Sequence, residues 1–252
     1  MAGAKPLQRW RGCVVPLLLT GAAEWWLHGT QSDAVAPPTR VLASLWDGLR
    51  DGTLLGASAQ TLSAAVGGLA IGGGLGVLMG LWLGLARRAA AAAALSVELL
   101  RPLPSMALAP IAMLVFGFGY RLELFVVAFT CFFPMLLLTQ AAVRSVEPRL
   151  LEVAQVLALG VVERAAKIVL PAASPRVFVA FRLSVGIALV VAVTTEIATN
   201  PQGLGYGLIS AQQALAPDRM LALLVWVGLL GWALNAGLLT LERRWFRRGV
   251  SE

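Results

Sequence analysis

The sequence predicts an all-α membrane protein with six transmembrane helices and one long amphipathic loop. The chain is 58% hydrophobic and only 13% charged, with a mean hydropathy of +0.79, whereas soluble proteins carry about 25% charged residues. Its apolar stretches are long and continuous, which favours helices over the alternating strands of a membrane barrel. Its basic residues also concentrate in every second connection, which is typical of a multi-pass topology.

Six apolar stretches approach or exceed the length of about 20 residues that a spanning helix needs. Within a single transmembrane domain, 1–252, they lie at roughly 12–29, 56–84, 92–117, 121–142, 176–198 and 219–240. Arg87 and Arg88 divide the second stretch from the third, because a charged residue at the centre of a span costs about 2.5–3.5 kcal/mol. Residues 1–23 also resemble a cleaved signal peptide. We favour an uncleaved first span, because apolar character resumes after Glu24.

The basic residues predict the orientation of the chain. Of the 20 basic residues, all but four lie in the termini and in alternate connections; the four are Arg40, Arg50, Arg121 and Arg219. The positive-inside rule therefore places both termini and the loop in the cytoplasm. Topology and attraction to anionic membrane lipid account for the net charge of +7, so no nucleic-acid partner is expected.

The loop, residues 144–174, predicts two short amphipathic helices at the membrane surface. Apolar residues recur at helical spacing from Leu150 to Leu157 and again from Val161 to Val169. We expect Gly160 to form the bend between the helices. We expect the second helix to end at residues 170–171, because a proline disfavours helix at the residue before it. An internal loop this ordered predicts that another protein binds it.

The second stretch carries a glycine at every fourth position. Four residues advance a helix by about 400°, so the stripe winds slowly around it. Lipid provides no hydrophobic drive for helix association, and a face without Cβ atoms lets two backbones pack closely. We expect a static packing seam, and a moving interface is the compatible alternative. The stripe consists of Gly68, Gly72, Gly76, Gly80 and Gly84.

Glu196 lies near the outer end of the fifth stretch. An ionisable residue inside a membrane is costly and is a functional candidate by default, here for a pathway or gate; capping or pairing at the interface is the alternative. No carboxylate lies near it in the sequence. The segment that follows, with Asn200-Pro201 and three glycines around Tyr206, predicts a turn-rich re-entrant loop. We interpret three other acidic residues near span boundaries as structural: Glu24, Glu98 and Glu123.

The sequence carries no pattern of a catalytic or cofactor site. Its only histidine, His28, follows two tryptophans, where a structural place at the membrane interface is expected. No His/Cys cluster has metal-ligand spacing. No phosphate-binding G-x-x-x-x-G-K-[ST] stretch occurs, so the chain is not expected to hydrolyse ATP itself. We therefore expect a non-catalytic protein that binds no cofactor or metal.

The loop resembles that of the membrane subunit of a bacterial ABC importer. The family's pattern is E-A-A, three residues, G, nine residues, I, one residue and L-P. Two positions depart from it, because Val153 replaces the first alanine and Ala158 stands at the family's glycine. We therefore expect the bend to be shifted to Gly160. The matching positions are Glu152, Ala154, Ile168, Leu170 and Pro171.

The resemblance extends to the permeases of the nitrate/sulfonate/taurine group, through ELLRPLPSMALAPIAMLVFGFG, AAVRSVEPRLLEVA, GLGYGL and AQQALAPDRM. It implies a type I importer permease of the bacterial inner membrane. It also implies three partners: a second copy, two ATP-binding cassette subunits that bind ATP and magnesium, and a periplasmic solute-binding protein. Leu157 and Val161 would then fill a cleft on the ATPase, with Arg164 or Lys167 pairing at its rim.

The resemblance leaves the substrate open among small organic or inorganic anions, such as a sulfonate, taurine or nitrate, and related nutrients. Few polar side chains are available to line a pathway, so selectivity is expected to reside in the solute-binding protein. A secondary transporter or channel acting alone and a membrane enzyme are the alternative classes. Besides Glu196 and Tyr206, the candidates for the pathway are Gln140, Arg182, Thr194, Thr195, Gln212 and Gln213.

Overall fold

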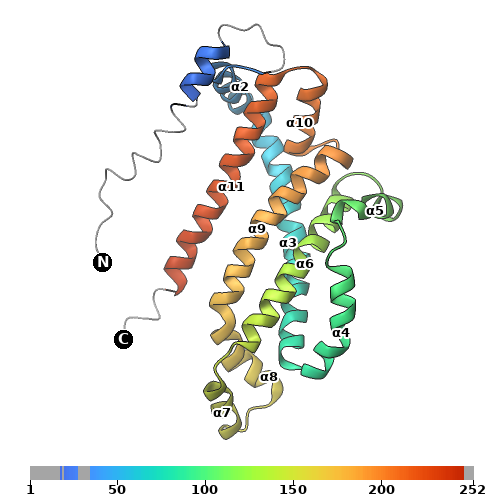
Figure 1. Ribbon diagram of the computed structural model, residues 1–252, viewed down its shortest axis with the longest axis vertical. Helices are drawn as coiled ribbons and strands as arrows, with labels where there is room; N and C mark the ends of the chain where they lie inside the picture. The colour runs from blue at the N-terminus through green and yellow to red at the C-terminus, as the bar shows by residue number, and fades with distance from the viewer. Residues whose placement is uncertain (1–17, 19, 28–34, 247–252) are drawn as a thin grey trace, which may run out of the picture.

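The computed structural model describes residues 18, 20–27 and 35–246, and this part of the chain is all-α as predicted. Long helices lie side by side, with the two short loop helices at one end of the molecule and α2 and α10 at the other (Figure 1). We call the first the loop end and the second the opposite end. The long helices are α3 (Thr53–Leu85), α6 (Tyr120–Arg144), α9 (Leu170–Thr199) and α11 (Pro217–Phe246).

The core of the fold is the packing of α3, α6 and α9 on one another, with α11 against α9, α10 and α2. Within the described residues, four helical segments are long and apolar enough to cross a membrane, or five if a bent pair counts as one span. These segments include the predicted stretches 56–84, 121–142, 176–198 and 219–240. Half of the predicted first span, 12–29, lies outside the described residues; the described part includes the helical residues 20–27.

The predicted third span, 92–117, is not one helix. It consists of α4 (Arg87–Leu100), the 3-10 turn η1 (Ser105–Leu108) and α5 (Ala109–Phe116), and the two halves are bent by 85°. Pro102 and Pro104 lie between the halves, and a proline interrupts the hydrogen bonds of a helix interior. The division from the second stretch falls as predicted, because only Ala86 separates α3 from α4.

Helix α2 (Pro38–Arg50) was not expected from the sequence. It begins beside the helical residues 20–27, because the Glu24 carboxylate accepts hydrogen bonds from the Thr39 backbone N–H at 3.0 Å and from the Thr39 hydroxyl at 2.7 Å. These bonds satisfy a free N–H in the first turn of α2. Glu24 therefore has the structural place that the sequence indicated.

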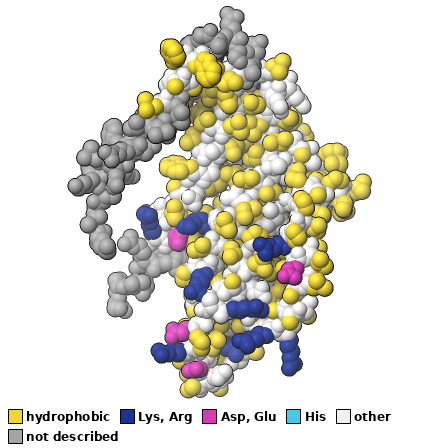
Figure 2. Space-filling model, viewed as in Figure 1, with side chains coloured by type: hydrophobic (Ala, Val, Ile, Leu, Met, Phe, Trp, Pro, Cys, Tyr) yellow, Lys and Arg dark blue, Asp and Glu magenta, His cyan; other side chains and the backbone are white. Residues whose placement is uncertain are grey.

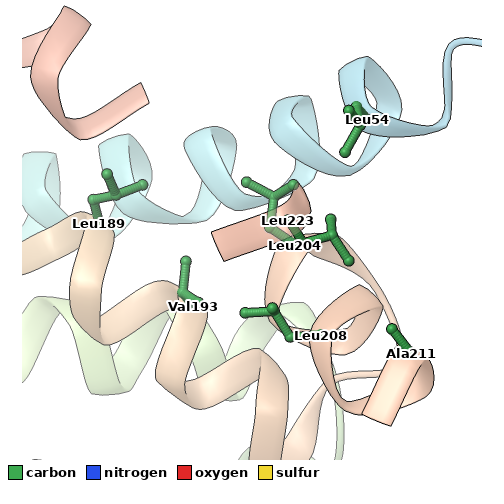
Figure 3. Close-up of a cluster of buried hydrophobic side chains, with 7 residues drawn as sticks. All are labelled: Leu54, Leu189, Val193, Leu204, Leu208, Ala211 and Leu223. Carbon is green, nitrogen blue, oxygen red and sulfur yellow. The ribbon is translucent and has the colours of Figure 1, made fainter. Parts of the chain in front are cut away.

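The segment expected to be a turn-rich loop contains a regular helix, α10 (Gly203–Gln213). Of its glycines, only Gly203 has a positive φ, +89°. Gly205 lies inside the helix, where an added Cβ would meet the Val193 carbonyl of α9. Apolar packing fixes α10 in place, as Figure 3 shows, through a buried cluster that joins α3, α9, α10 and α11; it consists of Leu54, Leu189, Val193, Leu204, Leu208, Ala211 and Leu223.

Candidate functional site

The amphipathic loop folds into two short helices, α7 (Pro148–Val156) and α8 (Val161–Arg164). Helix α7 ends in a Schellman motif: the Leu159 N–H donates to the Ala154 carbonyl at 3.0 Å, and the Ala158 N–H donates to the Gln155 carbonyl at 2.9 Å. The chain reverses here because Ala158 has a left-handed φ of +48°. These bonds satisfy carbonyl groups that the end of α7 would otherwise leave free.

The sequence suggested that the bend is shifted to Gly160, and this prediction was wrong. It lies at Ala158, the position where the family pattern has glycine. Gly160 has φ −63° and ψ 167°, an extended conformation that any residue adopts. The hydrogen bonds at the end of α7 determine which residue turns, and the chain accepts the steric cost of a Cβ there.

Ala158→Gly is expected to stabilise the loop by about 1 kcal/mol, because glycine has no Cβ and removes the strain of the left-handed conformation. This gain exceeds the extra backbone entropy that glycine loses on folding. Amide hydrogen exchange at residues 157–160 should then slow by roughly fivefold. Gly160→Ala is the matched control, because no atom lies within 4 Å of an added Cβ. If amide exchange slows equally in Ala158→Gly and in the control, Ala158 carries no strain.

The second loop helix does not end at Leu170-Pro171. Helix α8 continues through a π-turn, η2 (Ala165–Val169), into α9, so that Val161–Thr199 forms one helical segment of 39 residues. The π-turn ends two residues before Pro171, whose ring leaves this continuous segment without one interior backbone N–H donor. The loop is thus joined to a long helix without a break.

A patch of apolar side chains is exposed at the tip of the loop. We call it the loop patch; its members are 50–86% exposed, and they are Val153, Val156, Leu157, Val161 and Val162. Sequence reasoning selected only Leu157 and Val161 as contact residues. The helical spacing of apolar residues shows that α7 and α8 each have an apolar face. It does not show which of these side chains are buried against neighbouring helices and which are exposed.

The other residues of the family pattern have different environments. Ala154 is buried, at 1% exposure, and its role is to cap α7 through its carbonyl. Glu152 is exposed and Ile168 is partly buried. Leu170 and Pro171 are exposed at the start of α9.

The two cations that were expected to pair with the ATPase, Arg164 and Lys167, also differ. The Lys167 Nζ donates to Glu163 Oε1 at 2.9 Å across one helical turn, and such an exposed pair contributes little to stability. Arg164 is partly buried, and its Nε has no hydrogen-bond partner within the described residues.

The glycine stripe faces α6 along its whole length. An added Cβ at any of the five positions would lie within 3 Å of an α6 atom, and at Gly72, Gly76 and Gly80 the nearest atom is a backbone carbonyl oxygen. Gly74, on the same helix, has open space instead. Close backbone contact thus holds α3 to α6. The facing residues of α6 are Val127, Ala128, Phe132, Leu136 and Val143.

At the opposite end, Glu196 of α9 lies against Glu123 of α6. Each is 1% exposed, and the two carboxyl groups lie close enough to interact electrostatically. The Gly205 N–H donates to Glu196 Oε2 at 2.8 Å, and Asn200 Nδ2 donates to Glu123 Oε2 at 2.7 Å. The remaining oxygen of each carboxyl group has no hydrogen-bond partner in the described part of the chain. We call Glu123 and Glu196 the carboxyl pair.

Sequence reasoning missed this pair. It interpreted Glu123 as a boundary residue and found no carboxylate near Glu196, which is 73 residues away in the chain. The pair lies in the first turn of α6 and the last turn of α9. It joins α6, α9 and α10 at one end of the fold. A carboxylate close to the start of an apolar run was the only signal available.

Residues 72–248 match the family described as binding-protein-dependent transport system inner membrane component. The chain belongs to this family. It is 30% identical over 217 residues to the Bacillus subtilis protein named as an aliphatic sulfonates transport permease, covering 86% of this chain and 79% of that one. It is 27% identical over 248 residues to the taurine transport system permease of Escherichia coli, covering 95% and 90%.

The solved structures agree on the fold. A chain of the MetNI methionine ABC transporter, in an inward-facing conformation, superposes with a TM-score of 0.61 at 17% identity, covering 82% of this chain and 96% of that one.

The family match and the named relatives together identify the chain as an inner-membrane permease of an ABC importer of the nitrate/sulfonate/taurine type, and its relatives are non-catalytic membrane components. Within the described residues, no group of three or more His, Cys, Asp or Glu side chains could hold a metal ion.

The pathway candidates of this permease are not brought together within the described chain. Thr195 is fully buried, and its hydroxyl donates to the Val191 carbonyl at 2.8 Å. Arg182 pairs with Glu242 at 2.8 Å and so links α9 to α11. Gln140 lines a cavity near the loop end. The exposed candidates at or near the opposite end are Thr194, Tyr206, Gln212 and Gln213.

Proposed function

We propose that two copies of this permease form the pathway of an ATP-driven importer and that each copy binds an ATPase subunit through the loop patch. The observation that carries the proposal is the patch itself. Its five apolar side chains stand exposed on short helices that project beyond the long helices (Figure 1). An exposed apolar cluster on a polar segment marks a protein interaction site. Leu157 and Val161 fill the cleft of the partner, and Arg164 or Lys167 contacts its rim.

The continuous segment Val161–Thr199 supplies the mechanical connection. At about 1.5 Å per residue it extends for roughly 58 Å, from the loop patch to the carboxyl pair. Closure of the ATPase dimer on ATP and magnesium moves α8, and α9 carries that movement to α10. The π-turn at 165–169 is the place where the segment can bend.

The positive-inside rule supports an orientation with the loop and both termini in the cytoplasm. Basic side chains gather toward the loop end, while the remainder of the visible face is mostly apolar (Figure 2). A periplasmic solute-binding protein then delivers substrate at the opposite end. The names of the relatives, which include aliphatic sulfonates, taurine and nitrate, support a small anion or a related nutrient as substrate.

The carboxyl pair is the one observation that favours a transporter driven by ion coupling instead. Coupling sites of that class lie near the bilayer midplane, whereas this pair lies in the terminal turns of α6 and α9. Family membership also favours ATP as the source of energy. In vesicles that contain the permease alone, uptake of taurine, sulfonate or nitrate driven by an ion gradient would support the alternative.

Leu157→Asp is expected to reduce recovery of the ATPase with the permease at least tenfold, because a charge would enter an apolar interface at a central contact. The permease is co-expressed with the ATPase subunit encoded beside it, and both are quantified after affinity purification from membranes. The paired reversal Arg164→Glu with Lys167→Glu should act in the same direction.

Leu215→Asp is the matched control for that experiment. Leu215 is a leucine at the opposite end of the molecule that is 82% exposed, compared with 61% for Leu157, so the variant should recover the ATPase as the wild type does. Membrane insertion should be unchanged in all variants. Wild-type recovery of the ATPase with both loop variants would reject the loop patch as the binding site.

A further inference from the structure

A cavity of about 900 Å³ opens between α4, α6 and the amphipathic loop. Small side chains of α4 form one wall, among them Ala90, Ala93 and Ala94. Leu137 of α6, with Gln140 one turn further along, forms the other wall. The charged side chains that line it are Arg87, Arg101, Arg144, Arg164 and Glu98, so four arginines face one glutamate.

Within the described residues, the four arginines of this cavity form no ion pair. None of the four has a carboxylate within 4.0 Å, because the ion pairs of the described residues involve Arg149, Lys167 and Arg182 only. The Nε atom of Arg164 is buried without a hydrogen-bond partner among those residues. Like charges that share a partly enclosed space repel one another, and a buried donor without a partner is unfavourable.

We propose that this cavity binds an oxyanion, a phosphate, phosphonate or sulfonate group, on Arg144 and Arg164 with Gln140 as a further donor. A guanidinium group presents several N–H donors in a planar fork that matches an oxyanion. The alanine wall of α4 accommodates whatever carries the anionic group. Two sources share this chemistry, a soluble oxyanion from the aqueous phase and the headgroup of an anionic lipid.

The site is placed to influence the loop. Arg164 belongs to α8, and Leu151 of α7 and Val169 of η2 also line the cavity. A bound oxyanion would tie these loop residues to Arg144 of α6 and to α4. The inference goes beyond the proposed import function, because binding at the cavity requires neither substrate uptake nor the ATPase.

The test uses the full chain in nanodiscs of neutral phosphatidylcholine. Sodium sulfate, compared with sodium chloride at equal ionic strength, should raise the thermal unfolding temperature of the wild type. Arg144→Gln with Arg164→Gln should remove at least half of this shift. The control, Arg243→Gln with Arg244→Gln, removes two exposed charges of α11 outside the cavity and should retain the full shift.

A second arm replaces phosphatidylcholine with phosphatidylglycerol. If sulfate no longer raises the unfolding temperature of the wild type in phosphatidylglycerol, the lipid headgroup occupies the cavity. If sulfate still raises it, the occupant is a soluble anion. Protection of Arg144 and Arg164 from phenylglyoxal, mapped by peptide mass spectrometry on the wild type, tests the site even if the double variant does not fold. If neither sulfate nor phosphatidylglycerol protects them and the shifts of the cavity and control variants are equal, the proposal is overturned.

Discussion

Gly72→Ala is expected to destabilise the permease by about 1–3 kcal/mol, the usual cost of an overpacked interior. An added Cβ would meet the Cα, carbonyl carbon and carbonyl oxygen of Ala128. Because these are backbone atoms, no change of rotamer relieves the clash, and α3 must move away from α6. That movement weakens the most extensive helix pair of the fold. Gly72→Leu should prevent folding. Thermal unfolding of the purified protein in detergent measures the effect.

Gly74→Ala is the matched control, on the same helix two residues away. No atom lies within 4 Å of its added Cβ, so alanine should stabilise the helix by about 0.5–1 kcal/mol through its better helix propensity. The two substitutions should therefore shift the unfolding temperature in opposite directions. Equal shifts would show that the spacing of the glycines has no part in packing α3 against α6.

The features that the sequence predicted well depend on local patterns. Apolar length locates α3, α6, α9 and α11, because the bilayer requires about 20 apolar residues in a row. The helical spacing of apolar residues predicted the two loop helices. The glycine at every fourth position predicted a helix face that packs closely. Each of these patterns acts within one helix and does not depend on its neighbours.

The third span shows where hydropathy alone is insufficient. The stretch 92–117 is apolar enough to cross a membrane, yet it bends by 85° between α4 and α5. Pro102 and Pro104 were visible in the sequence, but a proline predicts an interruption and not the direction that the chain takes afterwards. That direction depends on the packing of η1 and α5 on α6.

The loop shows the limit of assigning a bend to the nearest glycine. Gly160 was the natural candidate, but the hydrogen bonds from Ala158 and Leu159 to the end of α7 place the left-handed residue two positions earlier. The choice depends on where α7 ends. Boundaries of helices are the least predictable part of a sequence pattern.

The contact between Glu123 and Glu196 could not be predicted from the sequence, because only the packing of α6 on α9 brings the two residues together. Disruption of this carboxyl pair is the second large effect that we expect. Glu196→Ala should destabilise the protein by about 1–3 kcal/mol, because the Gly205 N–H would lose its partner while buried. Helix α10 should loosen first, because Gly205 belongs to it. Amide exchange across residues 203–213 and thermal unfolding in detergent measure the two consequences.

Glu196→Gln separates the hydrogen bonds from the charge. Its carbonyl oxygen can accept from the Gly205 N–H, and its amide can donate to the Glu123 carboxylate. The glutamine variant should therefore unfold close to the wild-type temperature, because it keeps the acceptor for the Gly205 N–H and nearly the same side-chain shape. A loss of stability as large as that of Glu196→Ala would contradict this bonding scheme. With the fold intact, ATP-driven uptake by Glu196→Gln then decides the role of the pair: wild-type uptake indicates that the pair only positions α10, and lost uptake indicates that the carboxyl group itself takes part in gating.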